Sequence, residues 1–190
     1  MTDHIEGVIT DTFVTKSGDS VVFRYPRRDD VVAVTDYINT LSAEDTFITF
    51  SGEVVSVEEE EKYLKSVVES MEKGDSVYIY AEHEGKIVGV TNVERDKVGK
   101  KRKHHVATFG ISVAKEYRGQ GVGKKLMEVV IAEAKKNIKG LKMIKLTAFG
   151  VNAQALELYQ KLGFREFGSL PQGLLYRGEY IDEKYMHLPL

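Results

Sequence analysis

The chain has 190 residues, of which 42% are hydrophobic and 29% are charged. This length and composition predict one soluble globular domain over residues 1–190 and exclude a disordered or fibrous protein. The formal charge of -2 provides no global attraction to nucleic acid or a membrane, and the absence of cysteine excludes disulfides and a cysteine nucleophile. The chain shows no secretion signal and no apolar run long enough to span a membrane, so a cytoplasmic location is expected.

Two strands and a helix are predicted in the first part of the chain. In residues 12–26, β-branched and aromatic side chains flank a turn at Gly18. The apolar spacing that follows predicts a helix over residues 31–41, for which Asp29 or Asp30 supplies the N-terminal cap.

A second helix is predicted over residues 56–74. Ser56 and Glu59 have the spacing of a capping box at its start, and Gly74 supplies the stop signal at its end. The apolar residues between them recur at helical period and mark one face of the helix: Leu64, Val67, Val68 and Met71.

After Gly74, the spacing of the apolar residues changes from the period of a helix to the period of two that is typical of strands. Residues 76–94 are predicted to form a hairpin that turns near Gly85. The basic residues 95–105 follow, and they are interpreted as a solvated loop because no aromatic residues interleave with the charges. Residues 105–113 are predicted to form a third strand, in which Gly110 marks a bulge.

Helices and strands alternate over the rest of the chain. Residues 143–149 read as a strand, a short helix runs from Asn152 to Gly163, and the tail reads as strand, loop 168–178 and strand. This order predicts an α/β fold with a mixed, mainly antiparallel sheet flanked by helices. The helix that precedes residue 143 has one apolar stripe: Met127, Ile131, Ala134 and Ile138.

The stretch EYRGQGVGKKLMEVV, residues 116–130, places three glycines directly before that helix. A Rossmann fingerprint begun at Gly119 would need a glycine at Lys124, and a P-loop ending in Gly123 and Lys124 would need its first glycine at Arg118. Neither pattern is present. The first amides of a helix bind phosphates when no side chain blocks the approach, so the stretch still predicts a phosphate cradle.

The spacing of Arg118, two residues, Gly121, one residue and Gly123 resembles the acetyl-CoA signature of the GNAT family of N-acetyltransferases. Residues 152–164, NAQALELYQKLGF, are similar to the second signature of that family, and the tail GEYIDEKYMHL resembles the last strands of many members. Two spaced motifs in the right order are what identify the resemblance.

The resemblance covers about residues 75–190 and implies a single-domain, GNAT-like acyl-CoA N-acyltransferase fold. Residues 1–74 would supply N-terminal strands and acceptor-side helices. The implied reaction moves an acetyl group from acetyl-CoA, as cosubstrate, directly to a primary amine of a small molecule or a protein, without a metal. Protein N-termini, lysine, polyamines, free amino acids and antibiotics stay open as acceptors, and a homodimer is possible. The alternatives are a non-catalytic acyl-CoA sensor and, from the basic loop, a nucleic-acid-binding module.

The resemblance also implies a cofactor site. The pantetheine arm would pair with a strand that splays at a bulge, and the phosphates would lie in the glycine cradle, where Lys124 or Arg118 adds charge. Asn152 would hold the pantetheine. The cofactor-binding residues expected in this way are Ile111, Ser112, Val113, Arg118, Gly119, Gln120, Gly121, Val122, Gly123, Lys124, Asn152, Ala155 and Tyr159.

Tyr159 is the expected catalytic residue, because its hydroxyl would donate a proton to the CoA thiolate as it leaves. Asn152 and Tyr159 are seven residues apart, which brings both to one face of a helix. The attacking amine must be neutral, so a base or a water chain is also required. Glu94, His104 and His105 remain candidates for that base.

Overall fold

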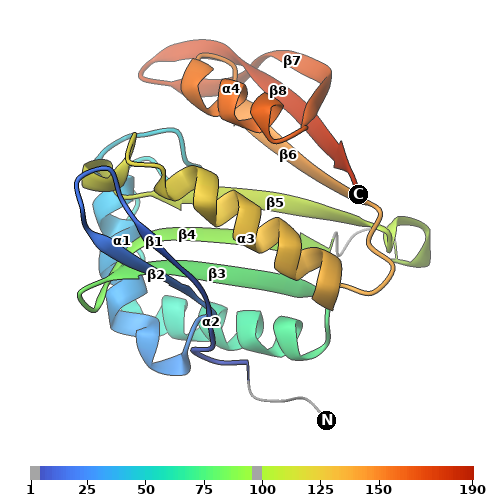
Figure 1. Ribbon diagram of the computed structural model, residues 1–190. Coiled ribbons are helices and arrows are strands. Elements are labelled where there is room, and N and C mark those ends of the chain that lie inside the picture. Colours follow the sequence, from blue (N-terminus) through green and yellow to red (C-terminus); the bar gives the residue numbers. More distant parts are fainter. Residues whose placement is uncertain (1–4, 96–99) are drawn as a thin grey trace. The chain divides into compact units, whose positions relative to one another are not determined.

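Figure 1 shows the computed structural model, which describes residues 5–95 and 100–190. The chain divides into two compact units. The first comprises Met1–Glu94 and Gly110–Lys139, and the second comprises Arg95–Phe109 and Gly140–Leu190. The expectation of one domain over residues 1–190 stays a prediction.

The first unit contains two antiparallel hairpins, as predicted. Gly18 (φ +97°) and Gly85 (φ +78°) lie in the two turns, where glycine adopts a left-handed backbone at little cost. Strand β4 is followed in the sheet by the last residues of β5. The strands are β1 (Ile9–Val14), β2 (Ser20–Arg24), β3 (Ser76–His83), β4 (Lys86–Arg95) and β5 (Val106–Val113).

Helices cover both faces of this sheet (Figure 1). Helix α1 (Val31–Ala43) forms a buried cluster with Tyr80 of β3. Helix α3 (Val122–Asn137) covers the other face of the sheet. Its residue Leu126 packs against Gly89, beside Ala81, and the side chain of Ala81 points away from that of Tyr80 because neighbouring side chains in a strand alternate. Within the described ranges, no helix is long and apolar enough to cross a membrane.

Helix α2 (Val57–Glu72) begins and ends as its sequence predicts. The Ser56 hydroxyl accepts a hydrogen bond from the amide of Glu59, and the Glu59 carboxylate accepts one from the amide of Ser56. Gly74 follows the helix with a φ of +71°. The four predicted apolar residues are all buried: Leu64, Val67, Val68 and Met71.

Asp30 occupies the N-cap position of α1, but its side chain makes no cap hydrogen bond, and Asp29 is exposed. The predicted position of the N-cap residue is therefore confirmed, but the expected cap hydrogen bond is absent. The Asp30 carboxylate is instead buried against Arg24, with Nη2–Oδ1 and Nη1–Oδ2 distances of 2.7 and 2.8 Å. It also accepts from the backbone amide of Arg27, while Arg24 Nε donates to Glu82 at 2.6 Å. Pairing this buried guanidinium outweighs the small gain from a helix cap.

The second unit contains the first residues of β5 and the last three strands. Strands β5 and β6 pair in parallel, and the remaining pairs are antiparallel. Strand β5 belongs to both units, and the hydrogen-bonded strand order is β1-β2-β3-β4-β5-β6-β8-β7. This order and the strand directions confirm the predicted mixed, mainly antiparallel sheet. The remaining elements are β6 (Met143–Phe149), α4 (Ala153–Lys161), β7 (Arg165–Tyr176) and β8 (Glu179–Pro189).

The expected loop over residues 168–178 is wrong. Strand β7 continues to Tyr176, and its register against β8 shifts between Leu170 and Leu174. Gln172 takes a left-handed φ of +56° there, and its amide donates to Asp182 Oδ1 at 3.2 Å. Proline and glycine in this stretch look like loop residues in the sequence, whereas the sheet accommodates them as an irregularity within a strand.

Replacing Asp30 with alanine is expected to destabilise the protein by about 3–5 kcal/mol, because it leaves the buried Arg24 charge without its bidentate partner. Urea unfolding followed by circular dichroism measures this change. The matched control is Asp29→Ala, which alters an exposed neighbour and should stay within about 0.5 kcal/mol of the wild type. Equal stabilities of the two variants would contradict this account of Arg24.

Candidate active site

The glycine stretch joins β5 to α3 and leaves a helix start without a side-chain cap. Gly121 is the N-cap residue, with a left-handed φ of 96° and no side-chain hydrogen bond. The first intrahelical bond runs from Lys125 N to Gly121 O over 3.1 Å, so the amides of Val122, Gly123 and Lys124 have no intrahelical partners. Three such amides at the positive end of a helix dipole form a site suited to an anion.

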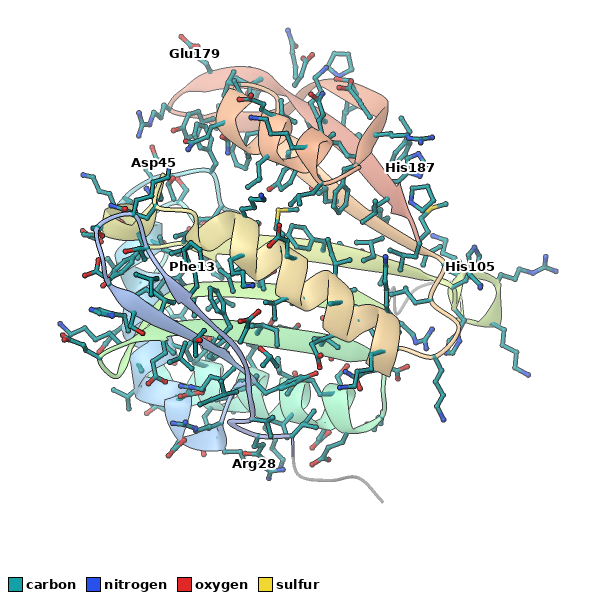
Figure 2. All side chains as sticks on the ribbon, in the orientation of Figure 1. Phe13, Arg28, Asp45, His105, Glu179 and His187 are labelled. Carbon is teal, nitrogen blue, oxygen red and sulfur yellow. The ribbon has the colours of Figure 1, made fainter. Side chains whose placement is uncertain are left out.

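Two glycines of this stretch serve different needs. A Cβ atom at Gly121 would lie 2.9 Å from Cζ of Phe13, so this position must lack a side chain as well as adopt a positive φ. Phe13, labelled in Figure 2, is on strand β1 of the same unit. A Cβ atom at Gly119 (φ +72°) would meet no described atom within 4 Å, so the backbone conformation alone favours glycine there.

Arg118 connects the glycine stretch to two other segments of the first unit. Its Nε donates to the carbonyl of Val113 at 2.9 Å, and its Nη2 forms an ion pair with Glu44 at 2.6 Å. Lys124, the other residue expected to add charge, lies 3.6 Å from Glu128 one turn along α3. Both cations of the motif therefore already have carboxylate partners.

The strand segment 111–113 presents backbone groups on two edges. Ala114 N donates to Val88 O of β4 at 2.9 Å, so alternation directs the peptide groups of Ser112 towards β4 and those of Ile111 and Val113 to the other edge. The parallel ladder between β5 and β6 covers Val106–Thr108 and Met143–Lys145. Within the described chain, that ladder does not extend to residues 111–113.

Helix α1 reaches the same strand segment. The Tyr37 hydroxyl lies 2.9 Å from Oγ of Ser112, and burial raises the pKa of Tyr37 well above its usual range. Close packing requires glycine at position 110, because a Cβ atom there would lie 2.7 Å from Oδ1 of Asn92 on β4. The predicted bulge at Gly110 stays a prediction.

Asn152 and Ala155 lie in the second unit, at the start of α4. Oδ1 of Asn152 accepts a hydrogen bond from the amide of Ala155 at 3.2 Å, so Asn152 is the N-cap residue of this helix. Its side-chain amide nitrogen remains able to donate.

Tyr159 is 8% exposed and packs in an aromatic cluster of the second unit. Its ring centroid lies 6.1 Å from that of Phe109 and 6.0 Å from that of Phe164. Burial raises the pKa of the Tyr159 hydroxyl to about 12, so the hydroxyl stays protonated across the physiological range. Among the described residues, this hydroxyl has no hydrogen-bond partner, and it remains able to donate.

The three candidate bases differ in their surroundings. Glu94 is half-buried on β4, two residues after Asn92 and on the same face of the strand. It accepts a hydrogen bond from the Tyr78 hydroxyl at 2.8 Å, and Tyr78 lies 3.1 Å from the hydroxyl of Tyr63. His104 and His105 are exposed.

The predicted site residues thus fall into two groups. Residues 111–113 and 118–124 belong to the first unit, and Asn152, Ala155 and Tyr159 belong to the second. The predicted basic loop lies partly outside the described residues, and its described part from Lys101 to His105 is exposed. No group of three or more metal-binding side chains occurs in the described ranges.

Sequence reasoning missed four residues that contact the predicted site: Phe13, Lys16, Tyr37 and Glu44. Lys16 Nζ lies 3.0 Å from the carbonyl of Gly119, although the two residues are 103 positions apart. No local spacing in the sequence links them, because each contact depends on how distant segments pack.

Two proteins of known name are similar to part of this chain. L-amino acid N-acetyltransferase AaaT of Escherichia coli (strain K12) is 36% identical over 103 residues, which cover 54% of this chain and 62% of that protein. N-acetyltransferase 8B of Homo sapiens is 32% identical over 93 residues, which cover 49% of this chain and 40% of that protein. The matches thus span less than two thirds of the length of either relative.

Many solved structures share the fold, among them the following two. A GNAT-family acetyltransferase from Streptococcus pneumoniae has a TM-score of 0.81 and 28% identity, over 90% of this chain and 99% of that one. The yncA structure from Salmonella typhimurium, which holds its cofactor acetyl-CoA, has a TM-score of 0.76 and 20% identity, over 90% and 94% of the two chains.

The model of the acetyltransferase (GNAT) family matches residues 38–164. This match covers more than half of the chain and contains the glycine stretch, the strand before it and helix α4. The chain therefore belongs to the GNAT family of acetyltransferases.

Proposed function

We propose that this protein transfers the acetyl group of acetyl-CoA directly to a primary amine of a small molecule or a protein. The observation that carries the proposal is the start of α3, where a left-handed Gly121 leaves the amides of three residues free to bind phosphate. The lack of cysteine favours direct transfer from bound acetyl-CoA over a thioester intermediate on the enzyme. The cytoplasmic location and the homodimer stay predictions.

The residues of the first unit fit both polar parts of the cofactor. The diphosphate would accept hydrogen bonds from the amides of Val122, Gly123 and Lys124, and Gly119 leaves the approach open. On the edge away from β4, the backbone groups of Ile111 and the amide of Val113 would pair with the pantetheine arm, while the Val113 carbonyl accepts from Arg118. In the proposal, Asn152 donates its side-chain amide to the same arm.

In the reaction, the neutral amine nitrogen attacks the thioester carbonyl carbon, a C–N bond forms, and the C–S bond breaks with its electron pair left on sulfur. The nitrogen then releases one of its two hydrogens to water as a proton, which leaves a neutral amide. An alkyl amine with a pKa of about 10.4 is mostly protonated at neutral pH and must first lose a proton. We assign this proton to Glu94, acting through water, because Glu94 lies on the face of β4 that carries Asn92 next to Gly110. His105 precedes Ile111 by six residues of extended chain, or about 20 Å, which is too far for direct transfer.

The role of Tyr159 follows from its raised pKa. Full proton transfer from a hydroxyl with a pKa of about 12 to a thiolate with a pKa of about 8.5 would cost about 5 kcal/mol. In place of the proton transfer that the resemblance implied, we propose that Tyr159 donates a hydrogen bond to the departing thiolate and keeps its proton. A hydrogen bond to a charged sulfur is worth about 1.5–3 kcal/mol.

Free amino acids are the first acceptors to examine, since the similar protein AaaT is named for them. Release of CoA thiol is followed while acetyl-CoA is mixed with amino acids, polyamines, peptides with free N-termini and lysine side chains, and aminoglycosides. Rapid thiol release with one class identifies the acceptor. Binding of CoA in calorimetry without turnover on any amine would instead support the non-catalytic sensor.

Tyr159→Phe is expected to lower kcat by about 10- to 100-fold with little change in the Kd for CoA, because the variant removes only the donor to the leaving sulfur. Steady-state kinetics and calorimetry test the two parts. Tyr185→Phe is the matched control, since it removes a hydroxyl of the same unit that donates to Glu183, and it should retain full activity. An unchanged kcat in Tyr159→Phe would remove Tyr159 from the mechanism.

Glu94→Gln is expected to lower kcat/KM about 100-fold at pH 7, because the variant lacks the carboxylate that removes a proton from the protonated amine substrate. Below the pKa of the amine, the residual rate should rise about tenfold per pH unit as the neutral amine becomes available. Glu84→Gln, in the exposed β3–β4 turn, serves as control and should behave as wild type. A loss in Glu94→Gln that stays constant with pH would indicate a structural role for Glu94.

A further inference from the structure

The β1–β2 hairpin is fastened to the start of α3. Asp11 Oδ2 lies 2.7 Å from Nζ of Lys125 on α3, and the hydrogen bond and charge of Lys125 lower the pKa of the Asp11 carboxyl. Two residues along β1, the Phe13 ring fills the space where a side chain at Gly121 would stand. These two contacts place the hairpin turn beside the glycine stretch.

The turn itself is held by internal hydrogen bonds. Thr15 N donates to Asp19 O at 2.9 Å, and Gly18 N donates to Thr15 O at 3.0 Å. The Ser17 hydroxyl donates to Asp19 Oδ2 at 2.7 Å, so the Asp19 carboxylate is engaged within the turn. The backbone that carries Lys16 therefore has a defined position.

Lys16 extends from this turn to the glycine stretch. Its Nζ donates to the carbonyl of Gly119 at 3.0 Å, and the side chain is otherwise exposed. An ammonium group has three donors, so two remain for a ligand. In the described part of the chain, no carboxylate lies within ion-pair distance of Lys16.

Three cations in and around the start of α3 have carboxylate partners. Arg118 pairs with Glu44, Lys124 with Glu128, and Lys125 with Asp11. Lys16 differs from these three cations, because no ion pair neutralises its charge in the described structure.

We propose that Lys16, from the N-terminal hairpin, binds the diphosphate of CoA together with the amides at the start of α3. The inference rests on the proposed function, because it assumes that CoA occupies the glycine stretch. The amides carry only partial positive charge, whereas a diphosphate carries full negative charges, so an ammonium group at the rim adds a charge-assisted bond. The hairpin thereby contributes to the cofactor site as well as to the fold.

The test compares the Kd for CoA of the wild type with that of Lys16→Met, which keeps the length of the side chain and removes its charge. Isothermal calorimetry should show binding about 3- to 5-fold weaker, the upper part of the range expected for an exposed charge pair. Lys16→Arg should bind within about twofold of wild type, because it keeps the charge. Lys65→Met removes an exposed cation from α2, which contacts α1 and β3, and should bind as wild type.

Shortened ligands locate the phosphate that Lys16 meets. The same loss with dephospho-CoA, and no loss with pantetheine, supports the diphosphate. A loss that vanishes with dephospho-CoA would overturn this assignment in favour of the 3′-phosphate, and a loss that persists with pantetheine would mean that Lys16 acts only through the fold of the turn. Equal affinity of Lys16→Met and wild type for CoA would end the inference, whereas failure of the wild type to bind CoA would refute the proposed function itself.

Discussion

The left-handed backbone at Gly121 is the constraint on which the proposed cofactor site depends. A residue with a side chain there would strain the backbone and would also meet the ring of Phe13. Because Gly121 provides no side-chain cap, the first amides of α3 remain available to a ligand. One glycine thus combines a sharp entry into the helix, close packing against β1 and an anion site.

The charged residues of the same motif make contacts within the fold. Arg118 connects the glycine stretch with the end of α1 through Glu44 and with β5 through the Val113 carbonyl. Tyr37 of α1 makes a second connection at Ser112. Hydrogen bonds within one unit therefore join α1, which is expected to face the acceptor, to β5, which is expected to hold the cofactor. A displacement of α1 would change these contacts of the strand.

Burial decides what the aromatic hydroxyls can do. Tyr159 lies among Phe109 and Phe164, where the phenolate form is disfavoured and the hydroxyl keeps its proton. Such a group is well suited to donate a hydrogen bond to a developing negative charge and poorly suited to give up a proton. The same burial raises the pKa of Tyr78 far above its usual range, so that Tyr78 remains a donor to Glu94.

Local patterns in the sequence determined the hairpin turns, the capping box of α2, the entry into α3 and the family. Each of these features depends on residues within a few positions of one another, and local backbone and hydrogen-bond preferences are enough to specify them. The expected loop over residues 168–178 was wrong because the same local preferences for proline and glycine are satisfied by an irregular strand once β8 lies alongside.

Only the tertiary structure decided which partners the charged residues have. The Asp30 carboxylate pairs with Arg24 and makes no cap hydrogen bond, Arg118 pairs with Glu44, and Lys16 lies beside Gly119. These pairs join segments that the sequence does not connect by any repeat or spacing. Their choice follows from the packing of strands and helices, which brings each charge within reach of one partner and removes others from reach.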